Sequence, residues 1–370
     1  MKTIGIDLGT TNSVAAIDGT TLQHATGTET TPIVPSVVAY PPSGAVLVGQ
    51  TARRRRAIDP KSTIFSAKRL MGQGWHSYVA TNFKEQYPFD LVELGDGCGF
   101  KTRAGTFAPQ DIGRQVIGKL LLARPASAAD CHVMISVPAA FEQSARDATR
   151  EAAARAGLQD VSIIEEPVAT AMAYSTMRSD RPRRAAVYDL GGGTFDLAIL
   201  DCQQEQASVV GYGGDAYLGG DDIDRTIADW AADQVIERFG WDLRSSEEVF
   251  DRLVLQSERA KIRIAFAAEA AIELSQVDPA APMAGESITL SREAVQDLAG
   301  ELVARTFVIC DEVLRDAKLD TSDIDAVYLA GGATLLPMVR DGVARYFSAL
   351  PRCDFDPMEV VAIGASLSGT

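Results

Sequence analysis

The sequence predicts an α/β protein with two similar lobes around one cleft, and three observations support this prediction. The chain has 370 residues, which is long for one compact core and favours two or more domains. A motif of strand, acid, glycine turn and threonine occurs at residues 4–13 and again at residues 186–196. Its acids, Asp7 and Asp189, lie 182 positions apart (189 − 7), about half the chain. We therefore interpret the motif as an internal duplication.

The first copy of the motif predicts a hairpin, with strands over residues 4–6 and 14–17. Glycine in the turn can adopt backbone angles that a side chain forbids. Turn amides can form a small concavity that binds anions, and a carboxylate suits Mg²⁺, which keeps much of its water. We therefore expect a phosphate and a divalent metal at the tip, which carries Asp7, Gly9, Thr10, Thr11 and Asn12.

The second copy has the same local order, with strands over residues 186–190 and 197–200. One such turn alone would be an ordinary end of a strand. Two copies half a chain apart predict that each lobe offers one phosphate-binding hairpin to a shared cleft. The tip of the second hairpin carries Asp189, Gly191, Gly192, Gly193, Thr194 and Asp196.

Composition and charge reduce the number of functions that the chain could have. Hydrophobic residues make up 46% and charged residues 23% of the chain, which is ordinary for a globular protein. The 35 basic and 50 acidic residues give a net charge of −15. This charge opposes non-specific nucleic-acid binding, which depends on neutralising phosphates. A polyphosphate must therefore be held by a local site and a metal rather than by the overall field.

The cysteines and histidines show no metal-binding pattern. The five cysteines are scattered and suit a reducing compartment, and each of the three histidines is expected to be structural. No apolar run is long enough to span a bilayer, and Asp7 interrupts the N-terminal apolar stretch before a signal peptide could form. We expect a cytoplasmic protein without membrane contact. The cysteines are Cys98, Cys131, Cys202, Cys310 and Cys353, and the histidines are His24, His76 and His132.

The first half of the chain continues with a proline-punctuated strand over residues 30–40 and a turn-rich stretch over residues 40–110 with short strands. We interpret this stretch as an inserted subdomain. Its basic run, residues 53–56, is expected to be a solvated helix face. The following elements are predicted in order: a helix over 110–122, a strand over 131–138, a helix over 142–156 with Gly157 as C-cap, a strand over 161–164, and a helix over 168–174 after Glu165, Glu166 and Pro167.

The second half begins, after its hairpin, with a helix from residue 218 whose acidic first turn suits the helix dipole. Residues 225–300 are predicted to be mainly helical, with strands over 271–274 and 287–290, and form a second inserted subdomain. A helix over 292–317 returns to the core, and a strand over 326–330 leads to Gly331 and Gly332, which open the next helix. Such a junction lets backbone approach a ligand closely. A short helix over 360–366 ends the chain.

These predictions divide the chain into two lobes, each with a core and an insert. Lobe I comprises residues 1–173 and 355–370, with its core at 1–39, 111–173 and 355–370 and its insert at 40–110. Lobe II comprises residues 174–354, with its core at 174–221 and 301–354 and its insert at 222–300.

Together these segments resemble the ATPase domain of the heat-shock protein 70 (DnaK-type) chaperones, within the actin-like ATPase and sugar kinase superfamily. The resemblance covers essentially the whole chain. It implies the actin-like ATPase fold: two lobes, each with a ribonuclease H-like core and an inserted subdomain, closing on Mg-ATP. The most specific stretches are residues 4–13, 68–70, 166–167, 189–196, 218–220 and 331–332.

The resemblance implies roles for matching residues in binding ATP or ADP, Mg²⁺ and a potassium ion (K⁺). Asp7 and Asp189 would hold the metal, largely through its waters. Lys68 would reach the γ-phosphate, and Glu166 would position the attacking water, with Thr194 and Asp196 beside it. Asp196 would also suit K⁺. Nucleotide contacts are implied for Gly9, Thr10, Thr11, Asn12, Gly191, Gly192, Gly193, Thr194, Gly219, Gly220, Gly331 and Gly332, and ribose contacts for Glu258 and Lys261.

The departures from the family pattern concentrate where adenine would bind. Ala265 and Ala333 replace hydroxyl or amide side chains, and Met358 replaces an acid. The arginine that would lie along the adenine face is absent, and Leu335 stands in its place. Lost hydrogen bonds and a lost stacked cation would weaken adenosine recognition by roughly a hundredfold. We therefore expect a relaxed choice of base, with ATP and GTP differing in affinity by less than about tenfold.

Coupling to partners rests on other positions. Pro138 and Arg146 match the family's interlobe switch. Ser162 stands where many members carry an arginine that contacts the substrate domain and J-domain partners. Binding of a J-domain co-chaperone and a nucleotide exchange factor is therefore an open expectation. The chain is expected to be a monomer.

The function expected from the sequence is a slow ATPase that acts as the nucleotide switch of an Hsp70-type chaperone. No peptide-binding β-domain is recognised up to Thr370, near which the family's apolar linker begins; the chain is either the ATPase portion of a longer protein or a free-standing homologue. Two alternatives stay open. One is a non-enzymatic module that binds ATP without appreciable hydrolysis. The other is a sugar or glycerol kinase, for which no acid suited to activate an acceptor hydroxyl is found.

Overall fold

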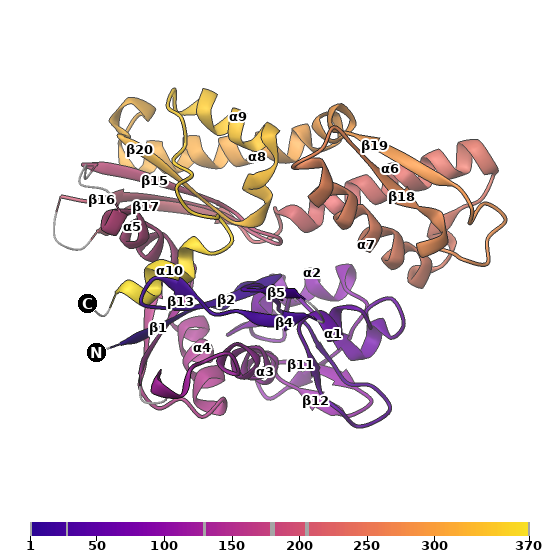
Figure 1. Ribbon diagram of the computed structural model, residues 1–370, viewed down its shortest axis with the longest axis horizontal. Helices are drawn as coiled ribbons and strands as arrows, with labels where there is room; N and C mark the ends of the chain where they lie inside the picture. Colours follow the sequence, from indigo (N-terminus) through magenta and orange to yellow (C-terminus); the bar gives the residue numbers. More distant parts are fainter. Residues whose placement is uncertain (1, 27–28, 129–130, 178–181, 204–206, 369–370) are drawn as a thin grey trace.

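A computed structural model describes residues 2–26, 29–128, 131–177, 182–203 and 207–368. Figure 1 shows two halves stacked on each other, each built around a sheet, with an insert at the same end of both. This mixed α/β architecture agrees with the predicted two-lobed fold. The exact lobe boundaries stay a prediction, and Thr370 lies outside the described residues.

The sheet of lobe I contains the first predicted hairpin. Its strands run in the order β14-β13-β1-β2-β3, and β6 also pairs with β2. β1 is antiparallel to β2 and parallel to β13, which is in turn parallel to β14. The strands are β1 (Thr3–Asp7), β2 (Asn12–Ile17), β3 (Thr20–Thr21), β6 (Val34–Pro35), β13 (His132–Val137) and β14 (Val161–Glu165).

The sheet of lobe II repeats this arrangement. Its order is β17-β16-β15-β20, with β15 antiparallel to β16 and parallel to β20. The strands are β15 (Arg184–Leu190), β16 (Phe195–Asp201), β17 (Ser208–Asp215) and β20 (Ala326–Ala330). Each copy of the motif therefore lies on a hairpin with a parallel strand beside its first strand, as a duplication predicts.

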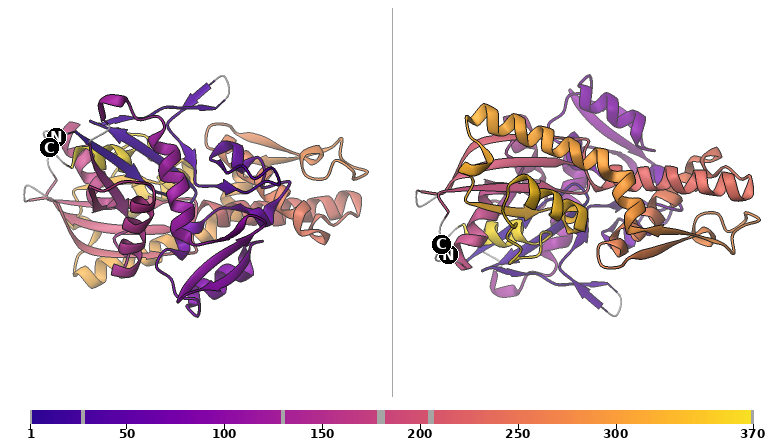
Figure 2. Two further views of the ribbon diagram at one scale, coloured as in Figure 1. Left: turned by 90° about the horizontal axis from the view of Figure 1, so that it is seen from below. Right: turned by 90° about the horizontal axis from the view of Figure 1, so that it is seen from above.

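Strand β17 was not predicted, although its residues alternate between exposed and partly buried. It contains Gly211, Gly213 and Gly214, and glycine lowers the preference of a segment for strand. A side chain at Gly213 would lie 2.6 Å from Val313 of α8 (Arg292–Ala317). The glycines thus let the helix approach the sheet, and Figure 2 shows α8 running along this sheet.

The lobe I helices agree with the predictions. α3 (Pro109–Leu121) and α4 (Gln143–Arg155) pack on each other, and Gly157 after α4 has a φ of 88°. This left-handed angle favours glycine and ends the helix. Figure 2 shows α3 and α4 in the view from below. The helix expected near residue 168 begins earlier, as α5 (Glu166–Met177).

Two helices lie between the sheets and join the lobes. α5 and α10 (Val360–Leu367) pack against each other, and their apolar side chains form one buried cluster with residues of both sheets, such as Val14 and Val187. A side chain at Gly364 would lie 1.7 Å from the Ala169 carbonyl oxygen. Only glycine permits so close a contact between the helix backbones. Figure 1 shows this junction at the end opposite the inserts.

The stretch from residue 24 to residue 107, which includes most of the insert of lobe I, differs in part from the prediction. Residues 30–40 were expected to be one strand, which is wrong: short strands alternate with turns there, since proline removes amide donors from a ladder. The helix α2 was not predicted, because it is short and buries only Ala80 and Phe83. The elements are β4 (His24–Thr26), β5 (Glu29–Thr31), β7 (Val38–Ala39), β8 (Leu47–Val48), α1 (Gln50–Arg53), β9 (Thr63–Ile64), α2 (Tyr78–Gln86), β10 (Asp90–Leu94), β11 (Gly97–Thr102) and β12 (Gly105–Phe107).

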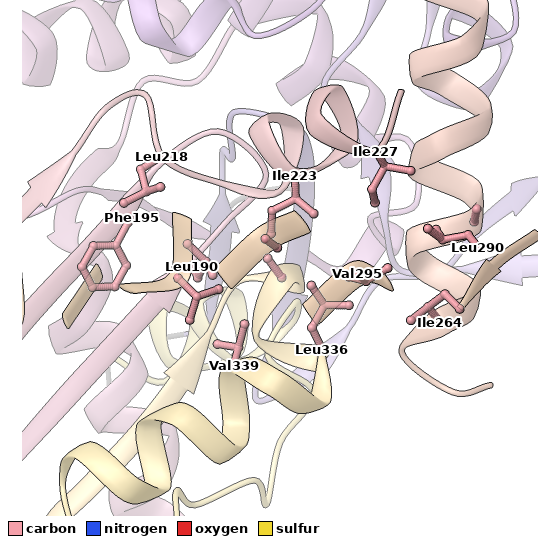
Figure 3. Close-up of a cluster of buried hydrophobic side chains, with 14 of the residues drawn as sticks. Leu190, Phe195, Leu218, Ile223, Ile227, Ile264, Leu290, Val295, Leu336 and Val339 are labelled. Atoms are coloured by element: carbon pink, nitrogen blue, oxygen red, sulfur yellow. The ribbon is translucent and has the colours of Figure 1, made fainter. Parts of the chain in front are cut away.

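The insert of lobe II shares a hydrophobic core with its sheet. Figure 3 shows Phe195 of the sheet at one end of this core and Ile264 and Leu290 of the insert at the other. The insert contains α6 (Gly220–Phe239), α7 (Glu247–Ile264), β18 (Glu269–Glu273) and β19 (Ser287–Ser291). Gly331 and Gly332 lead into a short 3₁₀ turn, and α9 (Pro337–Tyr346) begins only at the following proline.

Two further findings bear on the sequence analysis. All five cysteines lie within the described residues, and each is a free thiol. In the part of the chain that the structure describes, no helix combines the length and the apolar character needed to cross a bilayer.

Candidate functional site

The tips of the two hairpins face each other across a cavity of about 90 Å³. Residues distant in the sequence line this cavity, including Lys68 from the insert of lobe I and Glu166 from the start of α5. The structure thus brings most of the predicted site residues together. The lining comprises Asp7, Gly9, Thr10, Thr11, Asn12, Lys68, Pro138, Glu166, Asp189, Gly191, Gly192, Gly193, Thr194, Gly331, Gly332, Pro357, Met358 and Val361.

The first hairpin tip is held by hydroxyl groups. The Gly9 amide donates to Ser13 Oγ at 3.2 Å, and Ser36 Oγ donates to the Gly9 carbonyl at 2.8 Å. The two serine hydroxyls also bond each other at 2.8 Å. A side chain at Gly9 would lie 2.0 Å from the Asn12 carbonyl oxygen, so the turn requires glycine. The sequence analysis missed Ser13 and Ser36 as supports, because the contact joins segments that are far apart.

One hydroxyl in this turn is buried without a partner. Thr11 Oγ1 has no hydrogen bond to any of the described residues. A side chain at Gly192 would lie 2.1 Å from it, so the two hairpin tips touch at this point. Buried polar atoms are nearly always paired in native proteins. An unpaired hydroxyl beside glycine backbone therefore fits a site that receives an oxygen-rich ligand such as phosphate.

The second hairpin tip is held by the start of α6. The amides of Gly220 and Asp221 donate to the carbonyls of Gly191 and Gly192, at 3.0 and 2.6 Å. A side chain at Gly219 would lie 2.6 Å from the Gly192 carbonyl oxygen. Gly219 therefore supports the loop from behind rather than lining the cavity.

Arg69 links the two lobes beside the cavity, a role that the sequence analysis did not predict. Its guanidinium donates to the carbonyls of Gly193 and Ala216 and lies 4.8 Å from the centre of the Tyr217 ring. The side chain is buried. In the sequence, only its position next to Lys68 could have indicated this role. Arg69 thus fixes the second hairpin relative to the segment that carries Lys68.

Lys68 and Glu166 form an ion pair inside the cleft. Lys68 Nζ lies 2.8 Å from Glu166 Oε1, and the two side chains are 10% and 12% exposed. Burial by itself would lower the pKa of Lys68, but the nearby Glu166 and Asp7 carboxylates outweigh this effect and raise the pKa. The lysine is therefore charged and ready to interact with an anion.

The carboxyl groups of the cleft repel one another. Burial, followed by the charge of Glu166, raises the pKa of Asp7 and of Asp196 to about 7. The same causes, with Asp196 and Asp7, raise the pKa of Asp189. Ser136 Oγ donates to Asp7 Oδ1 at 3.2 Å and partly offsets this effect. A cation in the cleft would relieve the repulsion, so the residues present fit a bound divalent metal.

The acids do not form a closed set of direct ligands. Within the described residues, no group of three or more His, Cys, Asp or Glu side chains is arranged to hold a metal. Asp196 lies outside the main cavity and lines a small adjoining pocket with Pro138, Glu166 and Asp189. This arrangement suits Mg²⁺, which keeps several waters and needs only one or two carboxylates.

A second cavity of about 140 Å³ adjoins the first. Thr11, Gly192 and Met358, among other residues, line both cavities. Its polar residues include Glu258 and Lys261, which are already engaged. Glu258 lies 2.5 Å from Arg53 Nη2, and Lys261 Nζ donates to the Gly220 carbonyl and to Asp224. Burial would raise the pKa of Glu258, but Arg53 and Lys261 outweigh it and lower the pKa.

The far end of the second cavity is apolar. Ala265, Ala333, Leu335 and Met358, the four positions that depart from the expected pattern, all line this cavity, and Met358 also lines the first one. The sequence analysis missed Ile262 and Phe266, which lie beside them. The helical spacing of Ile262 from Glu258 could have revealed Ile262, and the exposure of Phe266 could not be foreseen.

A comparison with protein-family models matches residues 3–370 of the chain to the family described as Hsp70 protein. The chain belongs to the Hsp70 family. The fold is therefore the actin-like ATPase fold of this family. Hsp70 proteins are chaperones with an ATPase domain that binds ATP and ADP, typically with Mg²⁺, and they interact with co-chaperones. The match along the whole chain favours this assignment over a sugar or glycerol kinase.

The basic run of this Hsp70 protein corrects one prediction. Residues 53–56 were expected to be a solvated helix face, which is wrong for Arg53 and Arg56. Arg53 pairs with Glu258, and Arg56 pairs with Asp251 at 2.6 Å while lying 3.9 Å from the Phe65 ring centre. The reason is a contact between distant segments: α1 and the residues after it lie opposite Glu258 and Asp251 of α7. Only Arg54 is exposed as predicted.

The expected Hsp70 switch residues lie behind the cleft. Pro138 lines the phosphate cavity. Arg146 on α4 pairs with Glu165 at 2.8 Å and donates to the Phe141 carbonyl at 2.9 Å. Glu165 directly precedes Glu166, so a path of contacts leads from the cavity to α4. Ser162 lies on β14 and is partly exposed.

Proposed function

We propose that this protein is a nucleotide-switch ATPase domain that binds Mg-ATP between its lobes and hydrolyses it slowly to ADP and phosphate. The observation that carries the proposal is that both hairpin tips and the Lys68–Glu166 pair line one cavity. Each lobe thus contributes half of a phosphate cage.

The phosphate groups would lie between the hairpin tips. The hydroxyls of Thr10 and Thr11 and the amides of residues 192–194 would donate to phosphate oxygens, whereas the Gly191 amide already donates to the Thr194 carbonyl. The unpaired Thr11 hydroxyl supports this assignment, and the glycines of both turns let backbone approach the ligand closely. Asp7 and Asp189 would hold Mg²⁺ through its waters, and bound Mg²⁺ would neutralise charge on the phosphates.

Hydrolysis would proceed by positioning and electrostatic stabilisation, with water as the acceptor. The γ-phosphate would compete with Glu166 for the charged Lys68, and this exchange would free the Glu166 carboxylate to orient the attacking water. Thr194, which hydrogen-bonds to Asp196, would act beside them. The bond from the γ-phosphorus to the bridging oxygen would break as the water oxygen bonds to that phosphorus; ADP would leave with the bridging oxygen, and the proton of the water would pass to the released phosphate.

Other features stay proposals. We infer that a K⁺ ion could sit beside Asp196, that Pro138 and Arg146 pass the nucleotide state to other domains, and that the protein acts as a monomer. Binding of a J-domain co-chaperone would have to tolerate Ser162. A cytoplasmic location stays a prediction of the sequence analysis.

The test is to compare the parent protein with Lys68→Ala. We expect the variant to lose more than about a hundredfold in single-turnover phosphate release, since an electrostatic group in the transition state is removed. Its affinity for Mg-ATP in calorimetric titration should change little. Lys61→Ala is the control, because Lys61 lies in the same insert and is 67% exposed.

Two outcomes would contradict this proposal. Equal phosphate release by the variant and the parent would remove Lys68 from the mechanism. Binding of Mg-ATP by a parent protein that releases no phosphate would favour the second candidate, a non-enzymatic nucleotide-dependent module, which the apolar end of the cleft supports.

A further inference from the structure

The second cavity is the continuation of the phosphate site. The two cavities share lining residues from both hairpins, among them Thr11, Asn12 and Gly191. A ligand whose phosphates lie between the hairpins would therefore extend its nucleoside into the second cavity. This step, and the inference built on it, rest on the proposed function.

The far end of this cavity offers apolar surface on both sides. Ile262 and Phe266 lie at the end of α7 and just beyond it, Leu335 lies in the turn after β20, and Met358 lies just before α10, in lobe I. Ile262 is 50% and Phe266 76% exposed. Two large apolar side chains at the mouth of a cavity would gain stability when a flat ligand covers them.

The charged side chains that line the cavity are Asp221, Glu258 and Lys261, and two of them are already paired. Lys261 donates to Asp224 and to backbone, and Glu258 accepts from Arg53. Among the described residues that line the far end, none carries a polar side chain; they are Ile262, Ala265, Phe266, Ala333, Leu335, Leu336 and Met358. A base that lies against these residues would meet no side-chain donor or acceptor from them.

We propose that the site takes purine nucleoside triphosphates as a class and does not distinguish adenine from guanine. The base lies between Phe266 with Ile262 on one side and Leu335 with Met358 on the other. Stacking and burial tolerate different bases, since every base has a π-face. Strong discrimination arises when a wrong ligand leaves buried polar groups unpaired, and this end of the cavity has no such side chains.

The first experiment titrates the full chain with Mg-ATP, Mg-GTP, Mg-CTP and Mg-tripolyphosphate by calorimetry. We expect ATP and GTP to bind within about tenfold of each other. CTP should bind about tenfold more weakly, because a pyrimidine covers less apolar surface, and tripolyphosphate should bind most weakly. A preference for ATP over GTP above about a hundredfold would overturn the inference and leave the proposed function intact. Absence of binding by all four ligands would overturn the proposed function itself.

The second experiment tests the stacking residue. Phe266→Ala should weaken the binding of ATP and GTP equally, by about tenfold, as expected for one lost aromatic stack, and should leave tripolyphosphate binding unchanged. Phe239→Ala is the matched control, because Phe239 lies at the end of α6 in the same insert, is partly exposed and does not line the cavity. Unchanged purine affinity, or an equal loss of tripolyphosphate binding, would overturn the role of Phe266.

Discussion

The two ends of the cleft would hold a nucleotide by different means. Glycine turns, carboxylates and Lys68 line the phosphate end. Hydrogen bonds hold its turns both within a lobe, as from Ser36 to Gly9, and across the lobes, as from Arg69 to Gly193. At the nucleoside end the lining is mainly apolar, and Glu258 and Lys261 are engaged with protein groups. Phosphate charge can be stabilised only by groups at defined positions, whereas a base can be held by surface of the right shape. The second end therefore tolerates substitutions that the first does not.

The largest effect should come from blocking the contact between the two hairpin tips. In Gly192→Ala the new methyl group would lie 2.1 Å from Thr11 Oγ1, so one hairpin must move. We expect the affinity for Mg-ATP to fall by more than about tenfold, because each misplaced charge-assisted bond is worth ~1.5–3 kcal/mol. Calorimetric titration measures this loss.

The control for this variant is Gly300→Ala, since Gly300 lies within α8 and a side chain there meets no atom within 4 Å. Tripolyphosphate should lose affinity for Gly192→Ala as much as ATP does. If only ATP lost affinity, Gly192 would act at the nucleoside end, and the proposed difference between the two ends would be wrong.

A smaller effect is expected from the ion pairs that close the nucleoside end. Arg53→Ala and Arg56→Ala each remove a link between the two inserts, to Glu258 and Asp251. We expect labelled ADP to dissociate several-fold faster from both variants, because the cleft opens more often. Stopped-flow displacement measures the rate, and Arg54→Ala, at the exposed neighbour, should match the parent. Equal rates in all four proteins would show that these pairs do not limit opening.

The phosphate end should show a pH dependence of stability that can be traced to one of its carboxyl groups. The pKa of Asp196 is raised to about 7 in the folded protein, first by burial and then by Glu166, above its usual value near 4. The folded state then binds more protons than the unfolded state between these values, so the stability of the ligand-free protein falls as pH rises from 4 to 7. Asp196→Asn removes this group. The unfolding temperature of the variant minus that of the parent should therefore increase by a few degrees from pH 4 to pH 7.

Two results test whether Asp196 causes this pH dependence. Saturating Mg²⁺ with ATP should reduce the difference in unfolding temperature between Asp196→Asn and the parent, because a cation stabilises the ionised carboxylates. A constant difference between the variant and the parent from pH 4 to pH 8 would show that Asp196 is ionised throughout.

The smallest effect should be a change in overall dimensions. A ligand that touches both lobes favours the closed arrangement. ADP leaves the contacts of Lys68 and Thr194 with the γ-phosphate unmade, so we expect graded compaction: open without ligand, intermediate with ADP and most closed with ATP. Small-angle scattering on Lys68→Ala, which should hold ATP intact, measures the radius of gyration. Identical radii in the three states would mean locked lobes and a rigid binding module.

The sequence alone is enough to predict the parts of this protein that depend on local pattern. The two hairpins, the helix over residues 292–317 and the strand over residues 326–330 follow from glycine turns and apolar runs, and the structure has them where they were expected. The duplication is also visible, because a motif that occurs twice in one order needs no knowledge of contacts. Local pattern fails where it is weak, as in α2 and the glycine-rich β17.

Contacts between distant segments are decided only by the tertiary structure. Arg53 looks like a surface residue until the fold places it beside Glu258, 205 positions away (258 − 53). Ser13 with Ser36, Arg69 with Gly193, and Phe266 beside Leu335 are further cases. Their roles depend on distance in space and on burial, and an isolated stretch of sequence specifies neither. The phosphate end and the four departures at the nucleoside end can therefore be predicted from the chain, whereas Ile262 and Phe266 join the nucleoside end only in the folded protein.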